Sequence, residues 1–154
     1  TSVDIDIDAF IPSAYIKNEF QKLDMYKRIA SIQNADEYGE MLDELIDRFG
    51  ELPKPAANLL LVALIRAEAH AAGVVQLVHK EKETRIYMHE RADVDVAAIP
   101  DFLAEYGRRI QFKATAKNPY FLVNMNGFKG QGLLLEEKSL VENMLRILCH
   151  KELN

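Results

Sequence analysis

The chain has 154 residues, of which 49% are hydrophobic and 28% are charged, and its formal net charge is −5. This size and composition fit one domain with a substantial core, and the acidic balance argues against a general nucleic-acid binder, which usually carries a basic excess. The only cysteine, Cys149, excludes an internal disulfide, so we expect a reduced, cytoplasmic setting. The longest apolar run, residues 59–65, is far shorter than the roughly 20 residues of a membrane span, so no membrane association is expected.

The first predicted elements are a strand and a helix. Val3, Ile5 and Ile7 alternate with aspartates, and this period of two predicts a strand over residues 3–8 with one buried face. The aspartates are interpreted as its polar face, because a straight strand does not converge its side chains on a cation. Apolar residues at helical spacing then predict a helix over about 15–31. They are Phe20, Leu23, Tyr26, Ile29 and Ala30.

Two further helices follow. The second is predicted between Asn34, which forms a capping-box pattern with Glu37, and Gly50, which stands where a left-handed C-cap would fall. The third begins near Pro55, ends at about Ala72 and is apolar nearly all round, so it should be the central buried helix. The apolar stripe expected to bury the second helix comprises Tyr38, Met41, Leu42, Leu45, Ile46 and Phe49.

The pattern changes after Gly73, where strands become predominant. The predicted elements are strands at 74–79, 84–89, 108–115 and 120–125, a short helix near 95–106, and a last helix after the glycine-rich residues 127–132. Residues 1–73 therefore form a mainly helical part with an N-terminal strand and three helices. Residues 74–154 form a mixed part of order β-β-α-β-β-α. This segregation predicts a single domain of the α+β class.

No motif in the sequence assembles a catalytic, cofactor or metal site. The glycine-rich residues 127–132 are not followed by the Lys-Ser or Lys-Thr of a phosphate loop, and His89 lacks the second histidine of a zinc-binding helix. Cys149 and His150 are adjacent, so their side chains point apart on a helix. We therefore expect no catalytic residue, metal ligand or cofactor in this chain, and an interaction domain rather than a self-sufficient enzyme.

The second helix carries an acidic stripe opposite its apolar stripe. Glu37, Glu40, Glu44 and Asp47 recur at offsets of three and four. A solvated helix face is one interpretation. Carboxylates in the last turns, however, are disfavoured by the helix dipole by up to about 1 kcal/mol, and Arg48 offsets only part of that cost. The stripe is therefore also interpreted as a docking surface for a basic partner, with a salt-sensitive interaction.

A second candidate surface is the basic segment 108–117. It contains Arg108, Arg109, Lys113 and Lys117, which would suit a phosphate backbone. The alternation over residues 108–115 points Phe112 inward, whereas a stacking platform would need an outward aromatic ring. A basic solvent-facing strand is therefore favoured, and a nucleic-acid-binding accessory module is kept as the alternative function.

Three segments carry a resemblance to a known family. DAFIP at residues 8–12, YIKNEFQKLDMYKRIA at 15–30 and ELIDRFGELPKPAANLL at 44–60 closely resemble the C-terminal domain of bacterial transcription-repair coupling factors. The resemblance covers at least residues 3–72 with tight spacing and continues over 74–154 in element order. The stretch IDRFG-x-LP-x-P is long and free of gaps, which makes it far more specific than a short glycine motif.

The resemblance implies that this chain is the last domain of a larger multidomain protein. The parent would be an ATPase that uses ATP and Mg²⁺ to translocate on double-stranded DNA, removes stalled RNA polymerase and recruits the excision-repair protein UvrA. This domain would pack on the UvrB-like N-terminal module of the same polypeptide, mask its UvrA-binding surface and so hold the protein autoinhibited. The family's acidic contacts fall in ELIDRFG, which implies contacts through Glu44 and Asp47, with Glu40 and Arg48 beside them.

Overall fold

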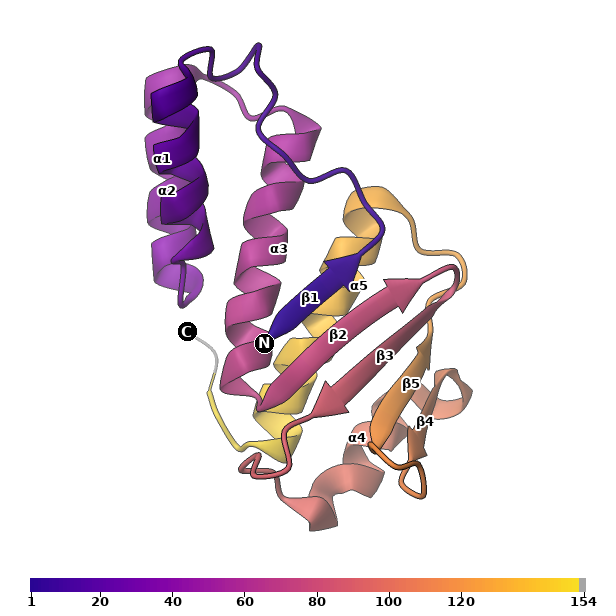
Figure 1. The fold of residues 1–154 in the computed structure, drawn as a ribbon. Coiled ribbons are helices and arrows are strands. Elements are labelled where there is room, and N and C mark those ends of the chain that lie inside the picture. Colours follow the sequence, from indigo (N-terminus) through magenta and orange to yellow (C-terminus); the bar gives the residue numbers. More distant parts are fainter. Residues whose placement is uncertain (153–154) are drawn as a thin grey trace.

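The computed structural model describes residues 1–152 and shows a five-stranded sheet with helices on one face and a helical hairpin to the side (Figure 1). This arrangement confirms the predicted α+β class and the β-β-α-β-β-α order of the second part. The elements are β1 (Ser2–Ile5), α1 (Glu19–Ala30), α2 (Ala35–Phe49), α3 (Lys54–Ala71), β2 (Val74–Lys80), β3 (Glu83–Met88), α4 (Ile99–Tyr106), β4 (Ile110–Lys113), β5 (Tyr120–Asn124) and α5 (Gly130–Asn143).

The sheet joins both parts of the chain. Its strand order is β1-β2-β3-β5-β4, with β1 parallel to β2 and the other pairs antiparallel. The predicted strand over 3–8 is too long, because β1 ends at Ile5. The Ile7 N–H donates to the Ile5 carbonyl at 2.8 Å, and this tight turn takes the chain away from the sheet.

Helix α3 lies between the two hydrophobic cores, as its apolar surface predicts. Leu61 and Ile65 belong to the core formed with the sheet and α5. Leu60 and Ala63 belong to the core formed with α1 and α2. A helix that buries opposite sides against two different partners must be apolar nearly all round, which is the pattern observed in the sequence. Within residues 1–152, no helix combines the length and hydropathy needed to cross a membrane.

The basic segment differs from its predicted form. The strand predicted over 108–115 is confined to Ile110–Lys113, and Arg108 and Arg109 lie in a 3₁₀ turn before it. The backbone of Gly107 has φ +57°, a conformation that favours glycine and that interrupts the extended path between α4 and β4. Phe112 does point inward and stacks on Phe121 with ring centroids 4.7 Å apart.

The helical hairpin buries a narrower surface than its apolar pattern predicts. Helix α1 uses Met25 and Ile29 to contact the core, whereas Phe20 and Leu23 project from nearly the opposite side and are 86% and 54% exposed. Ile46, which the apolar stripe also predicts in the core, is 44% exposed. It is not one of the side chains packed in the core formed with α1 and α3.

Candidate functional site

The acidic second helix is fixed at both ends by polar contacts. Its N-cap, Asn34, accepts a hydrogen bond from the Glu37 N–H at 2.9 Å, as the capping pattern predicts. Its last turn ends at Gly50, whose N–H donates to the Ile46 carbonyl. Gly50 has φ +90° and ψ −167°, a conformation that suits glycine but is not the predicted left-handed cap. The Tyr15 hydroxyl donates to the Gly50 carbonyl at 2.7 Å. The position of α2 is therefore fixed by the loop that precedes α1.

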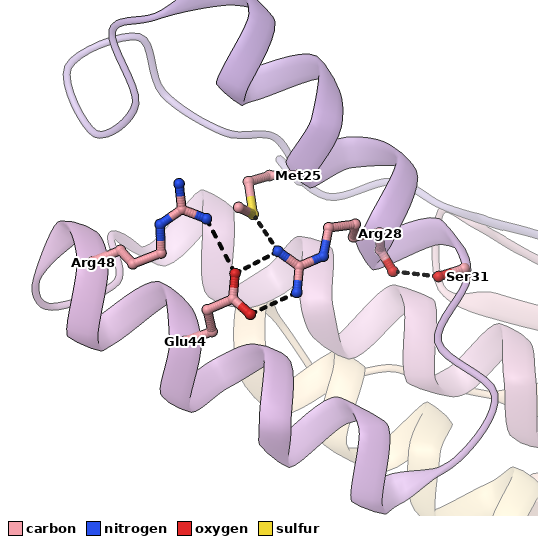
Figure 2. A network of polar contacts seen from close by, with 5 residues as sticks. All are labelled: Met25, Arg28, Ser31, Glu44 and Arg48. Atoms are coloured by element: carbon pink, nitrogen blue, oxygen red, sulfur yellow. Dashed lines mark hydrogen bonds and ion pairs between the residues drawn. The ribbon is translucent and has the colours of Figure 1, made fainter.

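Glu44 lies at the centre of an ion-pair network between α1 and α2. The Arg28 guanidinium donates to both Glu44 carboxylate oxygens, with a distance of 2.6 Å from Nη2 to Oε1. Arg48, one turn along α2, donates to the Glu44 Oε2 atom at 3.1 Å. Figure 2 shows the two guanidinium groups on opposite sides of the carboxylate. Such bidentate, charge-assisted contacts are stronger and more directional than neutral hydrogen bonds.

The network stabilises the charged forms of Glu44 and Arg28. Hydrogen bonding from Arg28, supported by Arg48, lowers the pKa of Glu44 from 4.5 to about 2. The same contact with Glu44 raises the pKa of Arg28. Arg48 also lies over the Phe49 ring, with its guanidinium carbon 5.0 Å from the ring centroid. Glu44 and Arg48 thus make contacts inside the domain.

The other acidic side chains of α2 face solvent. Glu40 and Asp47 are exposed on the side opposite the buried Met41 and Leu45. They lie one turn before and one turn after Glu44, and neither forms an ion pair within residues 1–152. All four predicted interdomain residues therefore lie on α2. Glu44 and Arg48 pair with each other, and the charges of Glu40 and Asp47 are not compensated by an ion pair within residues 1–152.

A shallow hollow of about 220 Å³ lies between the end of α1 and the middle of α2. Its polar lining contains the carboxylates of Glu37, Glu40 and Glu44 against the single guanidinium of Arg28. The Glu37 carboxylate also accepts from the Gln33 N–H at 3.1 Å, which leaves Glu40 as the outward-facing acid at the rim. The excess of carboxylates suits a basic side chain from a partner.

Sequence reasoning missed Arg28 as a member of this site. It lies on a different helix, 16 positions before Glu44, and no local spacing rule connects residues that far apart. A basic residue in the last turn of α1 has an adequate local explanation, because it complements the helix dipole. Only the packing of α1 beside α2 reveals its second role.

The predicted basic surface is divided among three environments. Arg109 is held by Glu136, at 2.7 Å, and lies over the Phe128 ring at 4.9 Å. Lys117 lies in the β4–β5 loop and lines a different hollow from Arg108. Lys113 ends β4, opposite Tyr120. The basic residues therefore do not form one continuous row, and Arg109 is engaged in packing within the domain.

The chain resembles proteins from several bacteria. A family model described as TRCF domain matches residues 5–99. The transcription-repair-coupling factor of Bacillus subtilis (strain 168) is 37% identical over 113 residues, which is 71% of this chain and 10% of that protein. The transcription-repair-coupling factor of Staphylococcus aureus (strain USA300) is 33% identical over 94 residues, or 61% of this chain and 8% of that protein.

A solved structure extends the likeness to nearly the whole fold. A crystal structure of the C-terminal domain of transcription-repair coupling factor superposes with a TM-score of 0.87 at 25% sequence identity. The match covers 98% of this chain and 96% of that one, whereas the chain spans about a tenth of the length of the curated relatives. The agreement in sequence over the first two thirds and in fold over both parts shows that the chain belongs to the TRCF domain family.

Proposed function

We propose that this chain is a non-catalytic, autoinhibitory domain of a transcription-repair coupling factor. In this proposal it packs on the UvrB-like N-terminal module of the same polypeptide and masks the surface that binds UvrA. The parent uses ATP and Mg²⁺, bound outside this chain, to translocate on double-stranded DNA, displaces stalled RNA polymerase and recruits nucleotide excision repair. Family membership supports the setting in transcription-coupled repair.

The observation that carries the proposed interface is the exposed acidic side of α2. Glu40 and Asp47 present carboxylates that are not neutralised within residues 1–152, and Ile46 exposes an apolar side chain beside Asp47. An interface commonly combines an apolar centre with charged groups that determine orientation and partner choice. A basic module with an apolar patch would complement this surface.

The proposal gives different roles to the two acidic residues of ELIDRFG. Asp47, together with Glu40, contacts basic side chains of the UvrB-like module. Glu44 is a positioning residue, because its two oxygens already accept hydrogen bonds from Arg28 and Arg48. Loss of Glu44 would remove this polar connection between α1 and α2 while their shared apolar core remains, so its effect on docking would be indirect.

The full-length protein provides the direct functional test. The double substitution Glu40→Lys and Asp47→Lys should raise the affinity for UvrA by about 5- to 150-fold, the range expected for a coupling free energy of about 1–3 kcal/mol, and should also raise basal ATPase activity. Glu105→Lys, an exposed charge reversal on α4, serves as the matched control and should leave both unchanged. Wild-type UvrA binding by a well-folded double variant would contradict the proposed interface.

A further inference from the structure

One face of the sheet is covered and the other is open. Helices α3 and α5 lie behind the strands, and within residues 1–152 no helix crosses the near face (Figure 1). Leu77, Ile86 and Phe121 are buried against the helices. Their neighbours along each strand must therefore point to the open face, because side chains alternate between the two faces of a sheet.

Two tyrosines form an aromatic pair on the open face. Tyr87 of β3 is directly opposite Tyr120 of β5 in the strand register, and their ring centroids are 5.1 Å apart. The Arg85 guanidinium carbon lies 5.2 Å from the Tyr120 ring centroid. Cross-strand aromatic pairs stabilise sheets. Here the rings are only half-buried, so part of their surface also remains available to a ligand.

The half of the open face formed by β3, β5 and β4 is basic, although the chain as a whole is acidic. Arg85 projects from β3 and Lys113 from β4, and Lys82 and Arg108 line a hollow of about 360 Å³ at one end of this face. The only carboxylate in that hollow lining is Glu83. A local basic surface on a chain of net charge −5 favours an anionic ligand at this position.

We propose that this open face binds single-stranded nucleic acid. Lys82, Arg108 and Lys113 contact phosphates, while bases stack on the exposed surfaces of Tyr87 and Tyr120. Aromatic rings and basic side chains on the same exposed sheet face are a recurrent arrangement for unpaired bases. A duplex keeps its bases stacked inside the helix, and the carboxylate side chains of an acidic peptide have no rings for the tyrosines to stack on. The autoinhibitory proposal uses α2, so this proposal does not depend on it.

Fluorescence anisotropy of a labelled 12-nucleotide single strand tests the proposal with the isolated 154-residue domain. A related C-terminal domain of nearly the same extent has been crystallised, which supports the use of the isolated chain. The logarithm of the association constant should fall linearly with the logarithm of salt concentration, and Lys113→Gln should reduce the magnitude of that slope by about 0.7. Lys27→Gln, which alters an exposed lysine on α1, is the matched control and should leave the slope unchanged.

The tyrosine variants distinguish stacking from simple charge attraction. Tyr120→Ala should weaken binding by about 5- to 100-fold, whereas Tyr120→Phe should keep affinity near that of the wild type. Phe20→Ala removes an exposed aromatic ring on α1 and is the aromatic control. A thermal melt of each variant shows whether the sheet remains folded. If Tyr120→Ala unfolds, Tyr120→Leu, which keeps an apolar side chain but removes the ring, should weaken binding in the same way.

The outcomes separate this ligand from its competitors. Binding of single-stranded DNA or RNA, with loss only in the open-face variants, supports the proposal, and parallel titrations show which of the two is preferred. The proposal is overturned if the single strand does not bind at low salt or if a duplex binds more tightly. Equal binding of a polyglutamate peptide, with no effect of Tyr120→Ala, would overturn it in favour of an acidic protein partner.

Discussion

Arg28 joins α1 to α2 by donating hydrogen bonds to both carboxylate oxygens of Glu44. The contact spans the hairpin, and Arg48 supports it from within α2. The residue that appears from the sequence to be a surface acid is therefore a structural connection between two helices. The carboxylates on either side of it, Glu40 and Asp47, are exposed, and the proposed interface rests on them.

Glu44→Gln should destabilise the domain at neutral pH. The substitution leaves Arg28 without its ionic partner, and we expect the free energy of unfolding to fall by about 1 kcal/mol, the upper end for partly exposed ion pairs. Urea unfolding followed by circular dichroism measures the change. Asp43→Asn, which alters an exposed neighbour on the same helix, should change stability by less than about 0.5 kcal/mol. Equal effects of the two substitutions would contradict a structural role for Glu44.

The same ion pair should make stability sensitive to acid. The pKa of Glu44 is about 2 in the folded domain and 4.5 ordinarily, so the unfolded chain binds a proton first as the pH falls. The contribution of Glu44 is complete above pH 4.5 and is lost as the pH falls through 2. Relative to Glu44→Gln, the wild-type advantage in unfolding free energy should therefore decline below pH 4.5. A constant difference between pH 6 and pH 2.5 would show that the carboxylate is not held by the arginines.

Glu137 should give the opposite pH dependence. It lies in the core, where the Thr84 hydroxyl donates to its Oε1 atom and its Oε2 atom has no hydrogen-bond partner within residues 1–152. Burial raises its pKa from 4.5 to about 7. The folded state therefore retains a proton that the unfolded chain releases. The contribution of protonated Glu137 to the free energy of unfolding is therefore fully present below pH 4.5 and is lost as the pH rises through 7.

Thermal melts between pH 5 and pH 8 test the Glu137 prediction. Glu137→Gln has the neutral shape of the protonated side chain but does not titrate. As the pH rises from 5 to 8, its free energy of unfolding should therefore increase by more than about 1 kcal/mol relative to that of the wild type. The exposed Glu105→Gln is the control and should follow the wild-type curve. If the stability of Glu137→Gln and that of the wild type depend on pH in the same way, the buried carboxyl does not titrate as described.

Two glycine substitutions should have opposite effects. Gly73 has φ +80°, and a Cβ atom there would lie 2.6 Å from the Cβ of Ala92. Gly73→Ala should therefore cost about 1–3 kcal/mol, through backbone strain and this contact. Gly39 lies inside α2 with open space around its Cα, so Gly39→Ala should stabilise by about 0.5–1 kcal/mol. Urea midpoints that shift in the same direction would contradict the two local environments.

Ile46 provides a test that separates docking from folding. Because it is 44% exposed, Ile46→Ser should change the free energy of unfolding by less than about 1 kcal/mol while weakening binding to the UvrB-like module several-fold. Val96→Ser, at a 72% exposed position before α4, should affect neither. Isothermal titration of the two domains measures the affinity. Unchanged affinity of Ile46→Ser would remove the apolar centre from the proposed interface.

The fold could be predicted from sequence to the extent that it depends on local periodicity. The central position of α3 follows from an apolar surface that has two partners, and the Asn34 cap follows from side-chain chemistry. Gly50 ends α2 as predicted, but not in the left-handed conformation. The end of β1 could not be found in this way, because Ile7 continues the alternation after the backbone has turned. Phe20 likewise fits a helical stripe that its helix does not bury.

The candidate site was predictable in position but not in its internal contacts. The acidic side of α2 follows from the spacing of Glu40, Glu44 and Asp47, but the neutralisation of Glu44 depends on Arg28 from another helix. The aromatic pair of Tyr87 and Tyr120 depends on the register of β3 and β5, which no single segment specifies. Contacts between distant segments are decided by packing, and the sequence contains no local signal for them.

The most direct test of the autoinhibitory role is binding of this domain to its UvrB-like module supplied in trans, measured by titration at 50 and 300 mM salt. We expect specific binding that weakens with salt and is reduced at least about tenfold by Asp47→Lys, with no loss for the distant Glu105→Lys. Absence of binding at low salt, or binding that is indifferent to both salt and Asp47→Lys, would contradict it.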